Sequence, residues 1–102
     1  MAAESVTVRL PAEVDLNSAA EVGQELARAA RSGARIVIAD LSATTFCDTT
    51  AVRMLLTATQ DAAASGVQLR LVIADGGPVR RVIDLLGLGG MLRSHPANPA
   101  GE

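Results

Sequence analysis

The chain has 102 residues, the size of a single domain, and its 49% hydrophobic residues are enough to build a core. The net charge of −2 argues against the basic surface that DNA and RNA require. Phe46 is the only aromatic residue, so the chain also lacks the aromatic faces on which bases stack. We therefore expect no direct nucleic-acid partner.

The cysteine and histidine content narrows the class of protein further. A single cysteine, Cys47, excludes an internal disulfide bond and fits a reducing compartment. The only histidine, His95, is expected to be solvated near the end of the chain, so no His/Cys metal set or cofactor is expected. No apolar run reaches the roughly 18 residues of a membrane-spanning helix, and no secretory signal precedes residue 6. These features predict a cytoplasmic protein that does not insert into a membrane.

The first part of the chain predicts a strand followed by a helix. Residues 6–10 alternate between apolar and polar side chains, which is typical of a half-buried strand that Pro11 ends. A polar corner at residues 13–17 leads to the first helix. Ser18 and Glu21 have the spacing of a capping box at its start, and Gly33 stops it.

The middle of the chain repeats this order. Residues 34–39 form a short, nearly continuous apolar run, which predicts a strand covered on both faces. After a short polar link, a second helix is expected from about residue 50 to residue 65, ended by Gly66. Four of its side chains are expected to form its inner face: Val52, Leu55, Leu56 and Thr59.

The last part predicts a third strand and a third helix. Residues 67–73 read as a strand, and Pro78 takes the first position of a helix that Gly87 ends. Its buried stripe is expected to be Val79, Val82, Ile83 and Leu86. Residues 91–93 predict a short strand or turn, and residues 94–102 a flexible tail. The order β-α-β-α-β-α indicates one α/β domain over residues 1–93, with a mostly parallel or mixed central sheet packed with helices.

An acid and two hydroxyls stand where the second helix begins. Asp48, Thr49 and Thr50 precede its apolar stripe, next to the unpaired N–H groups and the positive end of the helix dipole. The two threonines could cap the helix or accept a phosphate, and Asp48 is an alternative cap or a partner contact. Arg53 lies one turn after Thr49, as a solvated residue or a partner for a phosphate or an acidic group.

The other candidate residues support binding better than catalysis. Asp15 is expected to cap the turn before Asn17 and Ser18, and with Glu13 it marks the corner between strand and helix. Cys47 is more typical of a small core residue than of a redox site. The chain has no lysine, and its only histidine, His95, is expected in the tail, so no base is available to complete a catalytic pair with the acids. We therefore expect a protein that is not an enzyme.

Four segments carry motifs in a consistent order. LPAEVD at residues 10–15 is similar to L-x-G-E-(L/I)-D, a motif of one known domain family. IVIADL at residues 36–41 is similar to the central strand of the same family. FCDTTAV at residues 46–52 is similar to F-(M/L)-D-S-(S/T)-G-(L/I), and VRRVIDLLGL at residues 79–88 to V-x-R-(L/V)-(L/F)-x-x-x-G-L. Together these segments resemble the STAS domain of bacterial anti-sigma-factor antagonists.

The resemblance implies a function and its residues. In that family the antagonist binds an anti-sigma factor that is also a serine/threonine kinase, which frees the sigma factor and regulates transcription. The kinase phosphorylates the hydroxyl after the aspartate, here Thr49 with Thr50 as the alternative, and a phosphatase resets the phosphoprotein in this cycle of partner switching. The implied partner-binding residues are Glu13, Asp15, Asp48, Thr49, Thr50 and Arg53.

This sequence departs from the family pattern at the phosphorylation motif and at the corner. The hydroxyl residue is Thr49 rather than the commoner serine, Ala51 and Ala12 replace glycines, and Arg53 replaces a small residue. The departures at Ala51 and Arg53 keep open a second hypothesis, a STAS accessory subunit of a membrane transporter of the ABC type. In that role Thr49 would be an unphosphorylated interface residue.

Overall fold

The computed structural model describes residues 4–74, 76–87 and 93–94. Within them, the main sheet has four parallel strands. Their order across the sheet is β1 (Ser5–Arg9), β3 (Ile36–Asp40), β5 (Gln68–Val72) and β6 (Arg93–Ser94). A separate parallel pair joins β2 (Glu13–Val14) to β4 (Phe46–Cys47). The prediction of an α/β fold with a mostly parallel sheet is therefore confirmed.

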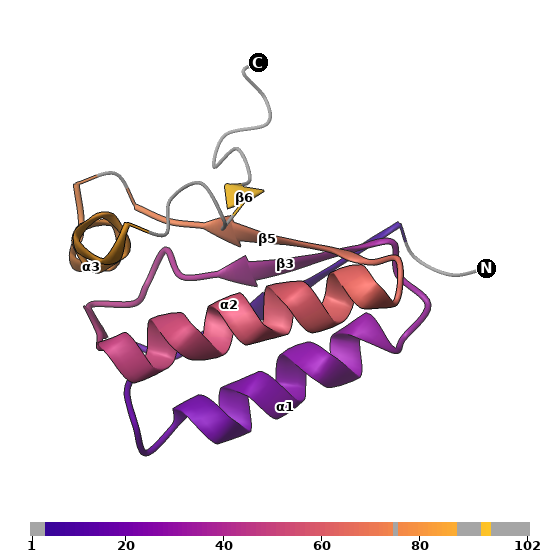
Figure 1. Ribbon diagram of the computed structural model, residues 1–102, viewed down its shortest axis with the longest axis horizontal. Helices are drawn as coiled ribbons and strands as arrows, with labels where there is room; N and C mark the ends of the chain where they lie inside the picture. The colour runs from indigo at the N-terminus through magenta and orange to yellow at the C-terminus, as the bar shows by residue number, and fades with distance from the viewer. Residues whose placement is uncertain (1–3, 75, 88–92, 95–102) are drawn as a thin grey trace.

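Two helices cover one face of the main sheet. α1 (Ala19–Ala30) and α2 (Thr49–Ala64) lie side by side there, and both begin at the end of the sheet that lies left in Figure 1. α3 (Pro78–Leu86) lies at that same end, where it packs on β4 and against α2. The first turn of α2 therefore lies close to β4 and α3.

The predicted elements agree with the structure to within two residues at most ends. Pro78 is the first residue of α3, and both Gly66 after α2 and Gly87 after α3 have positive φ, which a helix-ending glycine adopts without strain. β2 and β4 were not predicted as strands, because two-residue segments carry no measurable periodicity.

The prediction that the strand at residues 34–39, which is β3 in the structure, is covered on both faces is wrong. Val37 and Ala39 are fully buried under the helices, whereas Ile36, Ile38 and Asp40 on the opposite face are half-buried. Both α1 and α2 lie on the first face (Figure 1). The apolar run of β3 reflects a central position between β1 and β5, and not two covering layers.

The stripe predicted for the third helix is only partly correct. Val79 and Ile83 are buried and Val82 is half-buried, but Leu86 is 40% exposed and Leu85 is 79% exposed. Because α3 packs at the end of the sheet rather than along its face, its last turn has less surface to cover it.

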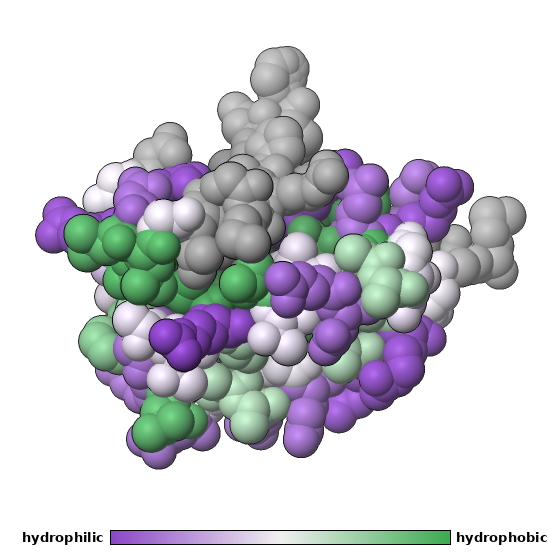
Figure 2. All heavy atoms as spheres, in the orientation of Figure 1, coloured by the Kyte–Doolittle hydropathy of each residue, from purple (hydrophilic) through white to green (hydrophobic). Residues whose placement is uncertain are grey.

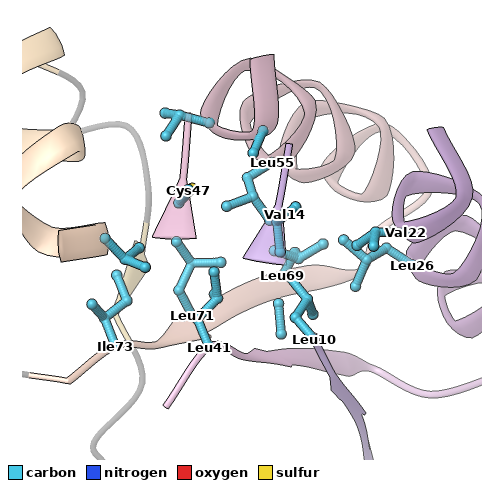
Figure 3. Packing of buried hydrophobic residues seen from close by; sticks show 14 of the residues in the cluster. Leu10, Val14, Val22, Leu26, Leu41, Cys47, Leu55, Leu69, Leu71 and Ile73 are labelled. Atoms are coloured by element: carbon cyan, nitrogen blue, oxygen red, sulfur yellow. The ribbon is translucent and has the colours of Figure 1, made fainter. Parts of the chain in front are cut away.

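The core fills the space between the sheet and the helical layer. Figure 3 shows the side chains of Leu69 and Leu71 from β5 pointing toward Val14, Cys47 and Leu55. Val22 and Leu26 of α1 close the same cluster on one side. Since Val14 and Cys47 belong to β2 and β4, the small strand pair is anchored in the main core.

The end of the chain is described only in part. Ser94 belongs to β6 and pairs with Leu71, although the predicted tail begins at this residue. The rest of that tail, residues 95–102 with His95, lies outside the described residues, as do Met91 and Leu92 of the predicted last strand or turn.

Candidate functional site

The strand pair β2–β4 places the corner beside the start of α2. Glu13 pairs with Phe46 and Val14 with Cys47, in parallel register. The Asp48 N–H donates to the carbonyl oxygen of Val14 at 3.4 Å, which continues the ladder to the first turn of the helix. Two segments that are distant in sequence therefore lie side by side, as the family resemblance implies for the corner and the phosphorylation motif.

The polar link before β4 is also tied to the corner. The buried hydroxyl of Thr44 donates to the carbonyl oxygen of Pro11 at 2.9 Å, and the Thr45 N–H donates to that of Ala12 at 2.8 Å. At the start of the link, the Ser42 side chain and N–H hydrogen-bond to Asp40 and hold the pKa of its carboxyl below its usual value. These bonds fix the path of the chain from β3 into α2.

Asp48 is the residue that caps α2. Its backbone is extended, and its carboxylate oxygen Oδ1 accepts the Ala51 N–H at 2.9 Å. The Val52 N–H donates to the Asp48 carbonyl oxygen, the first bond of the helix. The prediction that Asp48 is an alternative cap is confirmed, and the capping role considered for the two threonines is wrong.

The two threonines are the first two residues of α2. Neither Thr49 nor Thr50 makes a side-chain hydrogen bond in the part of the chain that the structure describes.

 The exposed residue of the pair is Thr49, whereas Thr50 is half-buried. Thr49 thus presents a hydroxyl that is open to solvent and not used by the fold.

Arg53 is exposed one turn further along α2. Its side chain makes no hydrogen bond or ion pair with any of the described residues. The next charged residue on the same helix is Asp61, two turns later. The guanidinium group of Arg53 is therefore available to a partner molecule or to a group added at Thr49.

The corner also contains an acid and a hydroxyl, Asp15 and Ser18, but here both side chains are hydrogen-bonded. Oδ1 of Asp15 accepts the Asn17 N–H at 2.9 Å and the Ser18 N–H at 3.2 Å, which confirms the predicted capped turn. The Ser18 hydroxyl oxygen accepts the Asp15 N–H at 3.0 Å, and Ser18 makes no side-chain cap bond to α1. The predicted capping box of Ser18 and Glu21 is wrong, because the corner itself uses this hydroxyl.

Cys47 lies directly behind the site. Its side chain is buried in the core cluster. Burial raises the pKa of the Cys47 thiol to about 11, and the negative charge of Asp48 adds to the increase. The thiolate is the nucleophilic form of cysteine, so this environment favours the inert core role over redox chemistry.

Two exposed hydrophobic side chains adjoin the acids of the site. Phe46, the residue paired with Glu13, is 49% exposed, and Leu16, next to Asp15, is 72% exposed. Hydrophobic side chains also gather over α3, at the left of Figure 2. Leu16 and Phe46 were not predicted as site residues. A lone leucine in a polar corner and a lone aromatic residue were the available signals.

The described residues hold no group of three or more His, Cys, Asp or Glu side chains placed to bind a metal ion. In the same part of the chain, no helix is both long and apolar enough to cross a membrane. The six predicted site residues divide into two clusters that the β2–β4 pair joins. Glu13 and Asp15 lie at the corner, and Asp48, Thr49, Thr50 and Arg53 lie at the start of α2.

Comparison with known proteins identifies the family. The family model of the STAS domain matches residues 2–98, nearly the whole chain, so the protein belongs to the STAS domain family. No curated protein matches the chain.

Several solved structures share the fold. One is described as the anti-sigma factor antagonist SpoIIAA in its unphosphorylated form, with a TM-score of 0.74, 21% identity, and coverage of 95% of this chain and 84% of that one. A second is the Bacillus cell fate determinant SpoIIAA in the phosphorylated form, with a TM-score of 0.66, 22% identity, and coverage of 95% and 87%. A third is the protein TM1081, with a TM-score of 0.78, 16% identity, and coverage of 99% and 81%.

Proposed function

We propose that this protein is an anti-sigma-factor antagonist that binds an anti-sigma factor with serine/threonine kinase activity and is released when Thr49 is phosphorylated. It would thereby regulate sigma-factor-dependent transcription in the bacterial cytoplasm. Membership of the STAS family and a fold shared with SpoIIAA support this proposal. SpoIIAA is described as an anti-sigma factor antagonist, and its structures include an unphosphorylated and a phosphorylated form.

The observation that carries the proposal is the free hydroxyl of Thr49. Asp48 already caps α2 through the Ala51 N–H, so the fold does not need the Thr49 hydroxyl. A kinase must reach the hydroxyl that it modifies, and Thr49 is exposed while Thr50 is half-buried. These differences favour Thr49 over Thr50 as the phosphate acceptor.

The position also tolerates a phosphate in the folded protein. A phosphate group adds about −1.5 to −2 charges, and a helix N-terminus stabilises a negative charge by about 0.3–1 kcal/mol at an exposed site. A partner that covers Thr49 would instead have to bury this charge, which costs several kcal/mol if the charge stays unpaired. Each 1.4 kcal/mol or so lowers the binding affinity about tenfold. Phosphorylation can therefore abolish binding without a large change in the fold.

The surface around Thr49 indicates the chemistry of the partner. Glu13, Asp15 and Asp48 supply acidic groups, and the exposed side chains of Phe46 and Leu16 lie beside them. A complementary partner surface would present basic residues around an apolar patch. The protein would act as a binding module rather than as an enzyme, and a serine/threonine phosphatase would reset it.

The test is phosphosite mapping of the protein recovered from its own cells, in growth and under stress. We expect one phosphate on Thr49, its loss in Thr49→Ala, and its retention in the matched variant Thr50→Ala. Affinity capture with the unphosphorylated protein should recover a kinase of the anti-sigma type. The protein with phosphothreonine at position 49 should recover at least about tenfold less of it, the loss that about 1.4 kcal/mol produces.

Two results would count against the proposal. A protein that carries no phosphate under any condition has no switch at Thr49. Recovery of an ABC-type ATPase or permease in place of a kinase would support the accessory-subunit hypothesis instead.

A further inference from the structure

We propose that Arg53 binds the phosphate group when Thr49 is phosphorylated, as an ion pair across one turn of α2. This inference rests on the proposed phosphorylation of Thr49. It adds that the same chain supplies a cation for the phosphate, and that phosphorylation withdraws this cation from the partner surface.

The spacing of the two residues supports the pair. Residues four apart on a helix lie on the same face, with Cβ atoms about 5–6 Å apart. Thr49 and Arg53 both belong to α2, and both side chains are exposed. Phosphorylated Thr49 would be the acidic residue and would lie N-terminal to Arg53, which is the better order for an i,i+4 pair on a helix. A guanidinium group can also bind phosphate through two parallel N–H donors.

Arg53 has no competing partner in the described residues. The first turn of α2 contains no acidic residue, and Asp61 is the first acid that follows on this helix. The carboxylate of Asp48 is held toward the helix by its bond to the Ala51 N–H. The guanidinium group is therefore free to move to a phosphate on Thr49.

The corner, α2 itself and the elements packed against α2 also carry charged side chains. They are Asp48 at the cap, Asp15 at the corner, Glu13 on β2, Glu21, Glu25 and Arg28 on α1, Asp61 on α2, Arg70 on β5, and Arg80, Arg81 and Asp84 on α3. The nearest in sequence, Asp48, repels a dianion. Arg53 is the basic residue on the helical face of Thr49, so it can offset this repulsion.

The consequence is a change at two points of the partner surface. In the unphosphorylated protein, Arg53 is exposed and can contact an acidic group of a partner. In the phosphorylated protein, the same guanidinium group would be engaged by the phosphate. Phosphorylation would then add negative charge at Thr49 and also remove the Arg53 contact.

The pair can be tested without any partner protein. The full chain is prepared with phosphothreonine encoded at position 49, and the second pKa of the phosphate is measured by ³¹P NMR titration. This pKa is ordinarily about 6. We expect a value lower by about 0.3–0.7 with Arg53 present than in Arg53→Gln, since a nearby cation favours the dianion. Arg53→Lys should keep part of the decrease, and high salt should reduce it.

A charge-matched control separates the pair from a general effect of net charge. Arg28→Gln removes the same charge from the last turn of α1, at the other end of the helical layer from Thr49 (Figure 1). It should leave the phosphate pKa within about 0.1 of the unmutated phosphoprotein. The backbone N–H groups at the start of α2 are present in every variant, so the difference between variants isolates Arg53.

Equal phosphate pKa values in the unmutated phosphoprotein and in its Arg53→Gln variant would overturn the inference, as would an equal change in Arg28→Gln. These outcomes do not depend on whether the cell phosphorylates the protein, because the phosphate is installed during synthesis. Conversely, a protein that is never phosphorylated in its cells would refute the proposed function and leave the measured ion pair standing.

Discussion

The two helix N-termini of the covering layer use an acid and a hydroxyl in opposite ways. Before α1, the Asp15 carboxylate accepts the Ser18 N–H, and the Ser18 hydroxyl oxygen accepts the Asp15 N–H. Before α2, the acid Asp48 caps the helix and the hydroxyl of Thr49 is left without a bond among the described residues. A hydroxyl at the start of a helix is therefore either hydrogen-bonded within the fold or left without a bond, and this depends on which neighbouring side chain accepts the backbone N–H groups.

The difference follows from the path of the chain before each helix. Asp15 follows the two-residue strand β2 directly and its carboxylate closes a turn, so the chain folds back on itself before α1 begins. Asp48 follows β4 in an extended conformation that points its carboxylate at the Ala51 N–H. The first arrangement engages its hydroxyl in the corner, and the second leaves the side chain of Thr49 exposed.

The largest expected effects test whether both helices are held mainly by their buried faces. Leu26 in α1 and Leu55 in α2 are almost fully buried, so Leu26→Ala and Leu55→Ala should each lower the free energy of unfolding by about 2–5 kcal/mol. Urea denaturation followed by circular dichroism measures both. A loss below about 1 kcal/mol in only one variant would mean that the two helices are not anchored alike.

A smaller effect is expected from removal of the cap of α2. Asp48→Ala should lower the free energy of unfolding by about 1 kcal/mol, within a range of about 0.5–2, because the Ala51 N–H loses its acceptor. Asp48→Asn should restore most of this stability, since asparagine is an equally good cap. If Asp48→Ala is as stable as the unmutated protein in urea denaturation, Asp48 is not the cap and the contrast between the two helices fails.

The smallest effects separate the two hydroxyls directly. Ser18→Ala should cost about 0.5–1.5 kcal/mol, because the Asp15 N–H loses its bond. Thr49→Ala should change the free energy of unfolding by no more than about 0.5 kcal/mol, and alanine's higher helix propensity favours the variant. Equal destabilisation in the two variants, measured side by side in urea, would show that the Thr49 hydroxyl also supports the fold.

Much of the site could be predicted from local sequence. The run of an acid and two hydroxyls before an apolar helix located the start of α2, and the spacing of Thr49 and Arg53 placed them one turn apart. The sequence could not decide between Asp48 and the threonines as the cap, because both residue types are good caps. That choice depended on the extended backbone of Asp48.

The sequence by itself determined the order of the three helices and of the longer strands β1, β3 and β5, the mostly parallel sheet, and the residues at the start of α2. These features depend on local propensity and on hydrophobic spacing, which a sequence carries directly. Only the tertiary structure decided that β2 and β4 pair, that Phe46 and Leu16 are exposed beside the acids, and that α1 and α2 lie on the same face of β3. These features depend on contacts between segments far apart in the chain, and two-residue strands have too little pattern to reveal such contacts.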